Sequence, residues 1–261
     1  MNIKQKVMPL LLGGDINVYS MARAFYEAYG IKSTAFGKYQ STQCSNSDIL
    51  DYRIMGKDND KQEVFLQNVL NFASEYKDKT IIMLGCGDNY LELAAKNKDK
   101  FPRNVIAPYI SYELMQTLIH KQKFYELCDK YGIDYPSTFV HNKNIGKNFE
   151  LPFSAPYVVK PSNSVMYWEC PFETQKKAYV AKTKEEMLSI LDDIYNAGYT
   201  DTLIIQDFIP GDDTYMRVMT NYSDKNAKVK LMCLGHVLLE EHTPHGIGNH
   251  AVIINEQNKQ L

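Results

Sequence analysis

The sequence lacks the features that mark several large classes of protein. Its five cysteines are odd in number and form no C-x-x-C pair, a pattern that fits reduced thiols rather than a disulfide framework. No long block of basic residues is present and the net charge is −2, so neither nucleic acid nor an anionic membrane surface is indicated as a partner. No apolar run is long enough to span a bilayer. We therefore expect a cytoplasmic globular protein, and a small charged substrate fits its composition.

The chain also lacks the G-x-G-x-x-G motif of dinucleotide-binding proteins. It has instead a glycine turn at residues 13–15, between an expected strand and an amphipathic helix, and a similar turn at residues 85–88. Backbone N–H groups at such helix starts favour anions, although the glycines could equally serve the turns alone. Asp15 and Asp88 are candidates for binding a substrate amine, but capping of the following helix is the simpler interpretation for both.

Strands and helices alternate along the first part of the chain, which indicates a parallel sheet with helical crossovers. In such sheets ligands lie beyond the carboxyl ends of the strands, where the two glycine turns fall. The alternation gives way to a long helix near residue 112, where we place a domain boundary. The expected strands are residues 7–12, 33–36 and 81–84, and the expected helices are residues 18–29, 64–72 and 90–95.

The rest of the chain predicts a different organisation, with strands of antiparallel type towards the end. We expect a helix over residues 114–131 with a break near His120, and a second helix over residues 184–195 that Thr183 caps. Residues 162–174 are expected to be irregular. The expected strands are residues 138–140, 157–160, 178–181, 203–205, 216–220, 229–234, 237–239 and 251–254.

One short motif combines a buried strand with a lysine. The β-branched pair Val158 and Val159 leads into Lys160, and Pro161 stops the strand just after it. The ammonium group is therefore expected at a strand end that faces the small polar loop of residues 162–164. A cation held there suits a phosphate group. A solvated strand-end lysine is the alternative interpretation of this motif alone.

A second motif changes from apolar to polar at the end of a strand. Residues 203–205 are apolar, Gln206 and Asp207 are polar, and Pro210-Gly211 forces a turn before two more carboxylates. Such a strand edge offers backbone groups to an adenine ring and acids to a ribose. Turn acids without a ligand are the alternative for this motif alone. The order and separation of the two motifs together favour an ATP site.

Two further features lie near the end of the chain. Arg217 alternates with apolar neighbours, so its side chain could project into a cleft. His242, His245 and His250 share one loop, but no carboxylate or cysteine set accompanies them at ligand spacing. We therefore favour a loop role over a metal site for these histidines.

These motifs together resemble the ATP-grasp superfamily and, more closely, the D-aspartate ligases of bacterial peptidoglycan synthesis. The resemblance covers essentially the whole chain. The stretches that carry it are residues 11–23, Lys160-Pro161-Ser162-Asn163-Ser164, residues 206–213, Gly235-His236 and residues 243–249.

The resemblance implies an α/β fold in which a Rossmann-like pre-ATP-grasp domain with a parallel sheet precedes an ATP-grasp domain. Residues 1–111 correspond to the first domain, residues 112–202 to the N-terminal ATP-grasp subdomain, and residues 203–261 to part of the C-terminal subdomain. In this family the two ATP-grasp subdomains clamp the nucleotide between them.

The resemblance also implies a role for individual residues. Two lysines meet the phosphates, the loop that begins at residues 162–164 covers them, and Gln206 reads the adenine amine beside a hinge edge at 207–209. Asp213 occupies the position of the acid that holds the ribose in this family. The implied nucleotide-binding residues are Lys123, Lys160, Ser162, Asn163, Ser164, Gln206, Asp207, Phe208, Ile209 and Asp213, and the implied catalytic residues are Arg217, which faces the reacting carboxylate, and Lys160.

The chemistry of the family is ATP-dependent phosphorylation of a carboxylate, which gives an acyl phosphate that an amine attacks. For the ligases that the chain resembles, the carboxylate is the side chain of D-aspartate and the amine is a lysine side chain of a peptidoglycan precursor. Phosphoryl transfer of this kind requires charge neutralisation and positioning, which lysines, an arginine and Mg²⁺ supply. The implied cofactors are therefore ATP and Mg²⁺.

One departure from the family pattern qualifies this expectation. The acidic and asparagine ligands that hold magnesium are expected beyond the end of this chain, so the chain contributes none of them. We expect weak nucleotide binding, an incomplete last subdomain with exposed apolar sheet surface, and a tendency to form homo-oligomers. A non-catalytic nucleotide-binding or interaction protein with the same fold is the main alternative. A dinucleotide-dependent oxidoreductase is a weaker one, because it leaves the ATP motifs unexplained.

Overall fold

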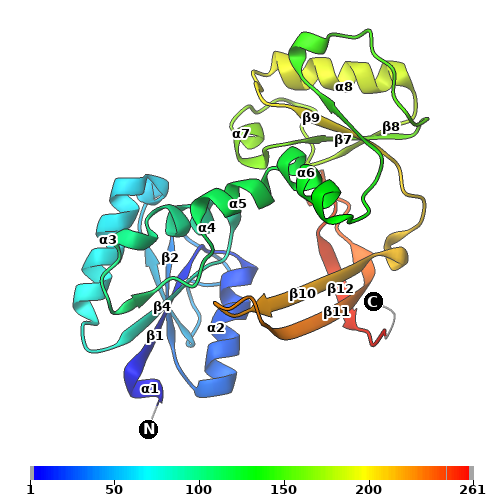
Figure 1. Ribbon diagram of the computed structural model, residues 1–261. Helices are drawn as coiled ribbons and strands as arrows, with labels where there is room; N and C mark the ends of the chain where they lie inside the picture. The colour runs from blue at the N-terminus through cyan, green and yellow to red at the C-terminus, as the bar shows by residue number, and fades with distance from the viewer. Residues whose placement is uncertain (1–2, 245, 259–261) are drawn as a thin grey trace. The chain divides into compact units, whose positions relative to one another are not determined.

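The computed structural model describes residues 3–244 and 246–258. The chain forms two compact units, Met1–Leu118 and Ile119–Leu261, and each is described by itself (Figure 1). The finer division into residues 1–111, 112–202 and 203–261 stays a prediction. None of the helices in the described ranges has both the length and the apolar character needed to cross a membrane.

The first unit is built on a five-stranded parallel sheet in the order β3-β2-β1-β4-β5, so the expected parallel sheet is confirmed. Its strands are β1 (Val7–Leu12), β2 (Ser33–Gly37), β3 (Leu50–Ile54), β4 (Thr80–Gly85) and β5 (Val105–Ile106). Its helices are α1 (Ile3–Lys6), α2 (Ile16–Tyr29), α3 (Gln62–Glu75), α4 (Asp88–Lys96) and α5 (Tyr112–Ile119), with 3₁₀ turns η1 (Lys57–Asp60) and η2 (Lys98–Lys100).

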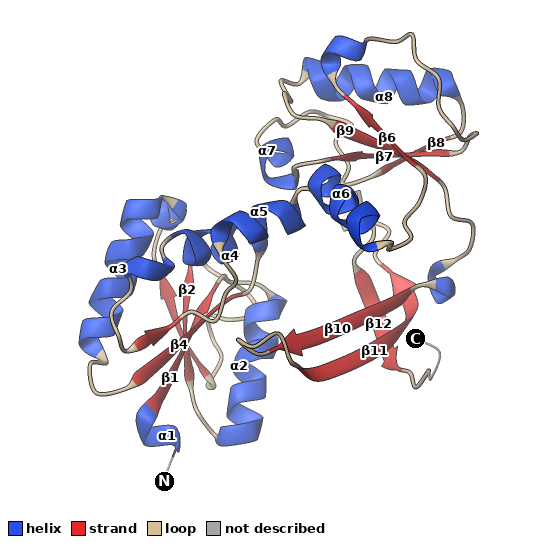
Figure 2. Ribbon diagram, viewed as in Figure 1, coloured by secondary structure: helices blue, strands red, loops and turns tan. Residues whose placement is uncertain are grey.

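The central strand β1 is buried on both faces, because helices cover the sheet on both sides (Figure 2). Leu10 and Leu12 belong to a core that includes Phe72 of α3. Leu11 belongs to a second core that includes Val18 of α2. The near-continuous apolar sequence of β1 follows from this two-sided burial.

The first glycine turn places Asp15 as the cap of helix α2. Its Oδ1 accepts hydrogen bonds from the backbone N–H groups of Asn17, at 3.1 Å, and Val18, at 3.4 Å. The capping interpretation of Asp15 is therefore confirmed. For Asp88 it is wrong, because Gly87 is the N-cap of α4 and Asp88 is the first residue of the helix.

The second unit contains a four-stranded sheet in the order β6-β9-β7-β8 and a three-stranded sheet in the order β10-β11-β12, and every strand pairing in both is antiparallel. The first consists of β6 (Thr138–His141), β7 (Tyr157–Pro161), β8 (Tyr179–Ala181) and β9 (Leu203–Asp207), and the second of β10 (Arg217–Ser223), β11 (Val229–Glu240) and β12 (His250–Asn255). The helices are α6 (Lys121–Tyr131), α7 (Ser164–Trp168) and α8 (Lys184–Asn196), with 3₁₀ turns η3 (Lys143–Ile145) and η4 (Asp213–Tyr215).

Helix α8 packs on the four-stranded sheet and closes its core. Met187 and Leu191 of α8 share a buried cluster with Val159 of β7 and Ile205 of β9. The hydroxyl of Thr183 accepts a hydrogen bond from the N–H of Glu186 at 3.2 Å, so the predicted cap of this helix is confirmed.

One predicted strand boundary is wrong. The runs at 229–234 and 237–239 form the single strand β11, which continues through Gly235. A Cβ atom on Gly235 would lie 2.5 Å from Ile253 Cγ2 and 3.0 Å from Val218 Cγ1. The glycine therefore allows close packing against both neighbouring strands and does not end the strand.

Several other elements differ from the sequence predictions. Strands β3 and β5 and helices α1 and α7 were not predicted, and α7 occupies the start of the segment expected to be irregular. The helix expected over residues 114–131 is two helices, α5 and α6, because His120 between them has an extended backbone with ψ of 111°. The break near His120 was predicted.

The three-stranded sheet exposes apolar side chains along all three strands within the described residues, as predicted. Association of copies through this surface stays a prediction. The exposed large apolar side chains of the sheet are Met219, Tyr222, Val229, Leu231, Met232, Leu238, Leu239, Val252, Ile253 and Ile254.

Candidate nucleotide site

A lysine and a glutamine meet on one face of the antiparallel pair of strands β7 and β9. Lys160 lies opposite Ile204, and Gln206 lies two positions further along β9, so the two side chains are diagonal neighbours on one face of the sheet. Lys160 Nζ donates a hydrogen bond to Gln206 Oε1 at 3.1 Å. The Gln206 amide, which is 1% exposed, donates from Nε2 to Thr138 Oγ1 at 2.8 Å. The amide orientation is thereby fixed, with its oxygen towards the lysine.

The environment of Lys160 disfavours its positive charge. Burial lowers the pKa of Lys160 below its ordinary value, and the nearby charge of Lys177 lowers it further. An ammonium group has three N–H donors, and the described residues provide one hydrogen-bond acceptor for them, Gln206. A buried cation with so little compensation is favourable only where an anion joins it.

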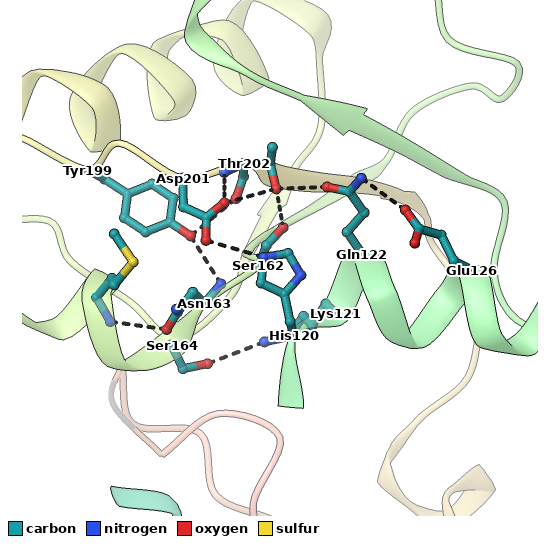
Figure 3. A network of polar contacts seen from close by, with 11 residues as sticks. His120, Lys121, Gln122, Glu126, Ser162, Asn163, Ser164, Tyr199, Asp201 and Thr202 are labelled. Atoms are coloured by element: carbon teal, nitrogen blue, oxygen red, sulfur yellow. Dashed lines mark hydrogen bonds and ion pairs between the residues drawn. The ribbon is translucent and has the colours of Figure 1, made fainter. Parts of the chain in front are cut away.

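The loop that follows β7 lies against a second lysine. Lys121 Nζ donates to Ser164 Oγ at 3.3 Å, and the Lys121 N–H donates to the carbonyl of Ser162 at 3.2 Å (Figure 3). Asn163 Oδ1 accepts from the N–H of Met166 at 3.2 Å and caps α7. The loop residues named from the sequence are therefore held beside Lys121.

Lys123, the lysine named from the sequence, is exposed on α6. Residues two positions apart on a helix point to different sides, so Lys121 and Lys123 do not face the same loop. The phosphate role of Lys123 stays a prediction, and the contact of Lys121 with this loop was not predicted from the sequence. The break at His120 was the available signal, because it makes Lys121 the first residue of a helix.

The expected hinge edge follows β9 directly. The N–H of Asp207 donates to the carbonyl of Ser137 at 2.9 Å, which ties the end of β9 to the start of β6. Ile209 is 68% exposed. An apolar side chain at the surface beside a strand end is compatible with an adenine ring, but the adenine contacts of Asp207, Phe208 and Ile209 stay predictions.

Asp213 is engaged by its own unit. Its Oδ2 accepts hydrogen bonds from the N–H of Glu240 and from Nε2 of His242, both at 2.9 Å. These contacts lower the pKa of the Asp213 carboxyl, the backbone N–H of Glu240 having the larger effect. The carboxylate therefore links η4 to the end of β11, and its ribose role stays a prediction.

Arg217 is also held within the second unit. Its Nε lies 2.5 Å from Glu256 Oε2, and its Nη1 donates to the carbonyls of Thr214, at 2.8 Å, and Met216, at 3.1 Å. The described hydrogen bonds connect neither Arg217 nor Asp213 to Lys160 or to the loop of residues 162–164. The role of Arg217 at a carboxylate stays a prediction.

The described residues offer little to a metal ion. Across residues 3–244 and 246–258, no group of at least three His, Cys, Asp or Glu side chains is placed to hold one. His242 contacts Asp213 and His250 contacts Glu240, while His245 lies outside the described residues.

The first unit has a cavity of its own at the carboxyl ends of its strands. It has a volume of about 360 Å³ and includes both glycine turns and the side chains of Asp15, Lys38 and Asn89. Lys38 is paired with Asp60, and Asp15 caps α2. The location is the one expected for a ligand in a parallel sheet.

Comparison with solved structures shows the class of fold. An L-amino acid ligase from Bacillus licheniformis matches with a TM-score of 0.63 and 14% identity over 96% of this chain and 55% of that protein. An N5-carboxyaminoimidazole synthetase from Staphylococcus aureus, solved with ADP, matches with a TM-score of 0.60 and 14% identity over 92% of this chain and 56% of that protein. The fold is that of the ATP-grasp ligases, with a Rossmann-like parallel-sheet domain first.

A sequence comparison gives a nearer relative. The D-aspartate ligase of Enterococcus faecium (strain Aus0004) is 42% identical over 264 residues, which cover 98% of this chain and 62% of that protein. The chain is therefore similar to this D-aspartate ligase along almost its whole length, and it spans less than two thirds of the relative's length. No protein-family model matches it.

Replacement of Lys121 by alanine is expected to weaken ATP binding by about tenfold to a hundredfold, because a charge-assisted hydrogen bond contributes roughly 1.5–3 kcal/mol. Lys123→Ala is the matched control on the same helix, and its affinity is expected to stay within about twofold of the parent. Isothermal titration calorimetry with Mg-ATP measures both. A larger loss in Lys123→Ala than in Lys121→Ala would return the phosphate role to Lys123.

Proposed function

We propose that this chain carries the nucleotide site of an ATP-dependent carboxylate-amine ligase that acts on an amino acid such as D-aspartate. The observation that carries the proposal is the partly buried ammonium group of Lys160, which donates to one neutral acceptor and lies at the end of β7, before the polar loop of residues 162–164. The similarity to D-aspartate ligase supports D-aspartate as the substrate, and the synthetase of the same fold that was solved with ADP supports ATP as the nucleotide.

In this proposal the described residues bind and orient ATP. Lys160 and Lys121 donate hydrogen bonds to phosphate oxygens and neutralise their charge, while residues 162–164 cover them. Gln206 Oε1 accepts from Lys160 and has a second lone pair for the adenine amine. The backbone at 207–209 completes the adenine contacts.

A carboxylate oxygen of the amino acid attacks the γ-phosphorus of ATP, and ADP leaves. A neutral amine then attacks the carbon of the resulting acyl phosphate, phosphate is released, and the nitrogen loses a proton to solvent. Mg²⁺ belongs to this class of reaction, but the described residues do not form a metal cluster, so we assign it no step here. A lysine amine of a peptidoglycan precursor is the proposed acceptor, in the cytoplasm.

The cavity of the first unit is the proposed place for the amino acid. It lies at the carboxyl ends of parallel strands and carries both a lysine and a carboxylate, Lys38 and Asp15, which suits a zwitterion. The second candidate function is a nucleotide-binding protein without ligase activity, which the absence of a metal cluster among the described residues favours.

Trapping of the acyl phosphate separates the two candidates. The chain is incubated with Mg-ATP and either D-aspartate or L-aspartate in the presence of hydroxylamine, which converts an acyl phosphate to a hydroxamate. The ligase proposal predicts hydroxamate and ADP with D-aspartate, and neither above background with L-aspartate or without an amino acid. ATP binding without any amino-acid-dependent hydroxamate would favour the second candidate.

A further inference from the structure

The side chain of His120 is used for a long-range contact. His120 is the N-cap of α6, yet its side chain makes no capping hydrogen bond. Its Nε2 lies instead 3.2 Å from Oδ2 of Asp201, 81 residues away in the sequence, and the two side chains are only 16% and 23% exposed. Its Nδ1 is buried and has no hydrogen-bond partner in the described part of the chain. The contact with Asp201 is therefore the ring's one described polar interaction.

Asp201 is connected to the loop after β7 through Thr202. Its Oδ1 accepts from the N–H of Thr202 at 2.7 Å. The hydroxyls of Thr202 and Ser162 lie 2.7 Å apart, and the N–H of Ser162 donates to the Thr202 carbonyl at 3.0 Å. The start of β9 therefore anchors the first residue of the loop.

The next two loop residues have anchors of their own (Figure 3). The N–H of Asn163 donates to the hydroxyl of Tyr199 at 3.1 Å, and Tyr199 is 1% exposed. Ser164 accepts from the ammonium of Lys121, the residue next to His120. The start of α6 and the start of β9 both contact the loop, and the contact between His120 and Asp201 joins them to each other.

We propose that the contact between His120 and Asp201 is a positioning device that fixes Lys121 and the loop of residues 162–164 relative to each other. Neither residue touches the nucleotide. Their effect is to present the donors of Lys121 and the loop in one arrangement, which reduces the ordering cost when phosphates bind. The inference rests on the proposed nucleotide site and concerns its phosphate end alone, because the adenine is assigned to residues 206–209.

The test compares ATP with adenosine, which lacks the phosphates. In the full chain, Asp201→Asn and His120→Gln are each expected to weaken ATP binding by about tenfold and to leave adenosine binding within about twofold. The double variant is expected to be no weaker than either single variant, since the two residues act through one contact. Calorimetry gives the affinities.

Asp192→Asn is the matched control. Asp192 belongs to the same unit and pairs with Lys147 at the surface, with side chains 45% and 63% exposed. The same change of carboxylate to amide there is expected to alter neither affinity. Equal losses for ATP and adenosine in the Asp201 and His120 variants, or no loss for either, would overturn the positioning role.

A measurement without nucleotide keeps this inference separate from the proposed function. Hydrogen exchange at residues 162–164 is expected to be faster in Asp201→Asn than in the parent, with exchange in β7 unchanged. Unchanged exchange in the loop would overturn the positioning role by itself. A parent chain that binds no ATP would overturn the nucleotide site, and with it the effect on phosphates.

Discussion

Lys160→Met is expected to weaken the stabilisation of the protein by Mg-ATP. The change keeps the aliphatic stem of the lysine and removes the ammonium group that sits at the end of β7, 3.1 Å from Gln206. Charged hydrogen bonds to phosphate contribute roughly 1.5–3 kcal/mol, so the loss corresponds to a fall in affinity of about tenfold to a hundredfold. Burial lowers the pKa of Lys160, which means that the folded state disfavours its charge, so removal of that charge is not expected to unfold the protein. We therefore expect the variant to remain folded.

A thermal-shift titration with Mg-ATP measures this effect, because a ligand that binds the native state raises the unfolding midpoint with its concentration. The parent midpoint is expected to rise, and the variant is expected to need about tenfold to a hundredfold more Mg-ATP for the same rise. Lys182→Met is the control, since Lys182 is exposed just after β8. A rise in Lys160→Met equal to that of the parent would remove Lys160 from the site.

Phe72→Ala is expected to destabilise the first unit by about 3–5 kcal/mol, the usual cost of removing a large aromatic side chain from a core. Phe72 is 2% exposed, and its ring meets Phe36 edge-on at 5.4 Å. The guanidinium of Arg53 lies 5.2 Å from the same ring. The variant therefore loses buried area, an aromatic pair and a cation–π contact together.

Urea unfolding followed by far-UV circular dichroism measures this loss. The single tryptophan, Trp168, belongs to the second unit, so its fluorescence does not report directly on the first. Val64→Ala on the exposed face of α3 is the control, with an expected change within about 0.5 kcal/mol. A loss in Phe72→Ala that matched the control would mean that Phe72 is not part of a close-packed core.

The two central strands of the site could be predicted because their signals are local. Val158 and Val159 are β-branched, Pro161 ends the strand one residue after Lys160, and the polarity of β9 changes at Gln206. Each signal lies within a few residues of the position it defines. The antiparallel pairing that brings Lys160 to Gln206 then follows from the register of β7 and β9.

The features that sequence reasoning missed depend on contacts between distant segments. The contact of Lys121 with the loop of residues 162–164 depends on where α6 begins, and His120 at that point contacts Asp201, 81 residues away. The continuity of β11 depends on Ile253 and Val218, which lie in the neighbouring strands and crowd Gly235. Strand β3 is an exception, because Leu50–Ile54 alternates apolar and polar residues; this local signal of a half-buried strand was overlooked.

The most direct test of the account is the location of bound nucleotide in the chain. Photolabelling with 8-azido-ATP, in the presence and absence of excess ATP, marks residues close to the adenine ring, and peptide mapping then identifies them. The account predicts ATP-protected labelling in the peptides that contain residues 137–138 and 206–209, at the ends of β6 and β9. ATP-protected labelling at the glycine turns of residues 13–15 or 85–88, with none in the second unit, would contradict it.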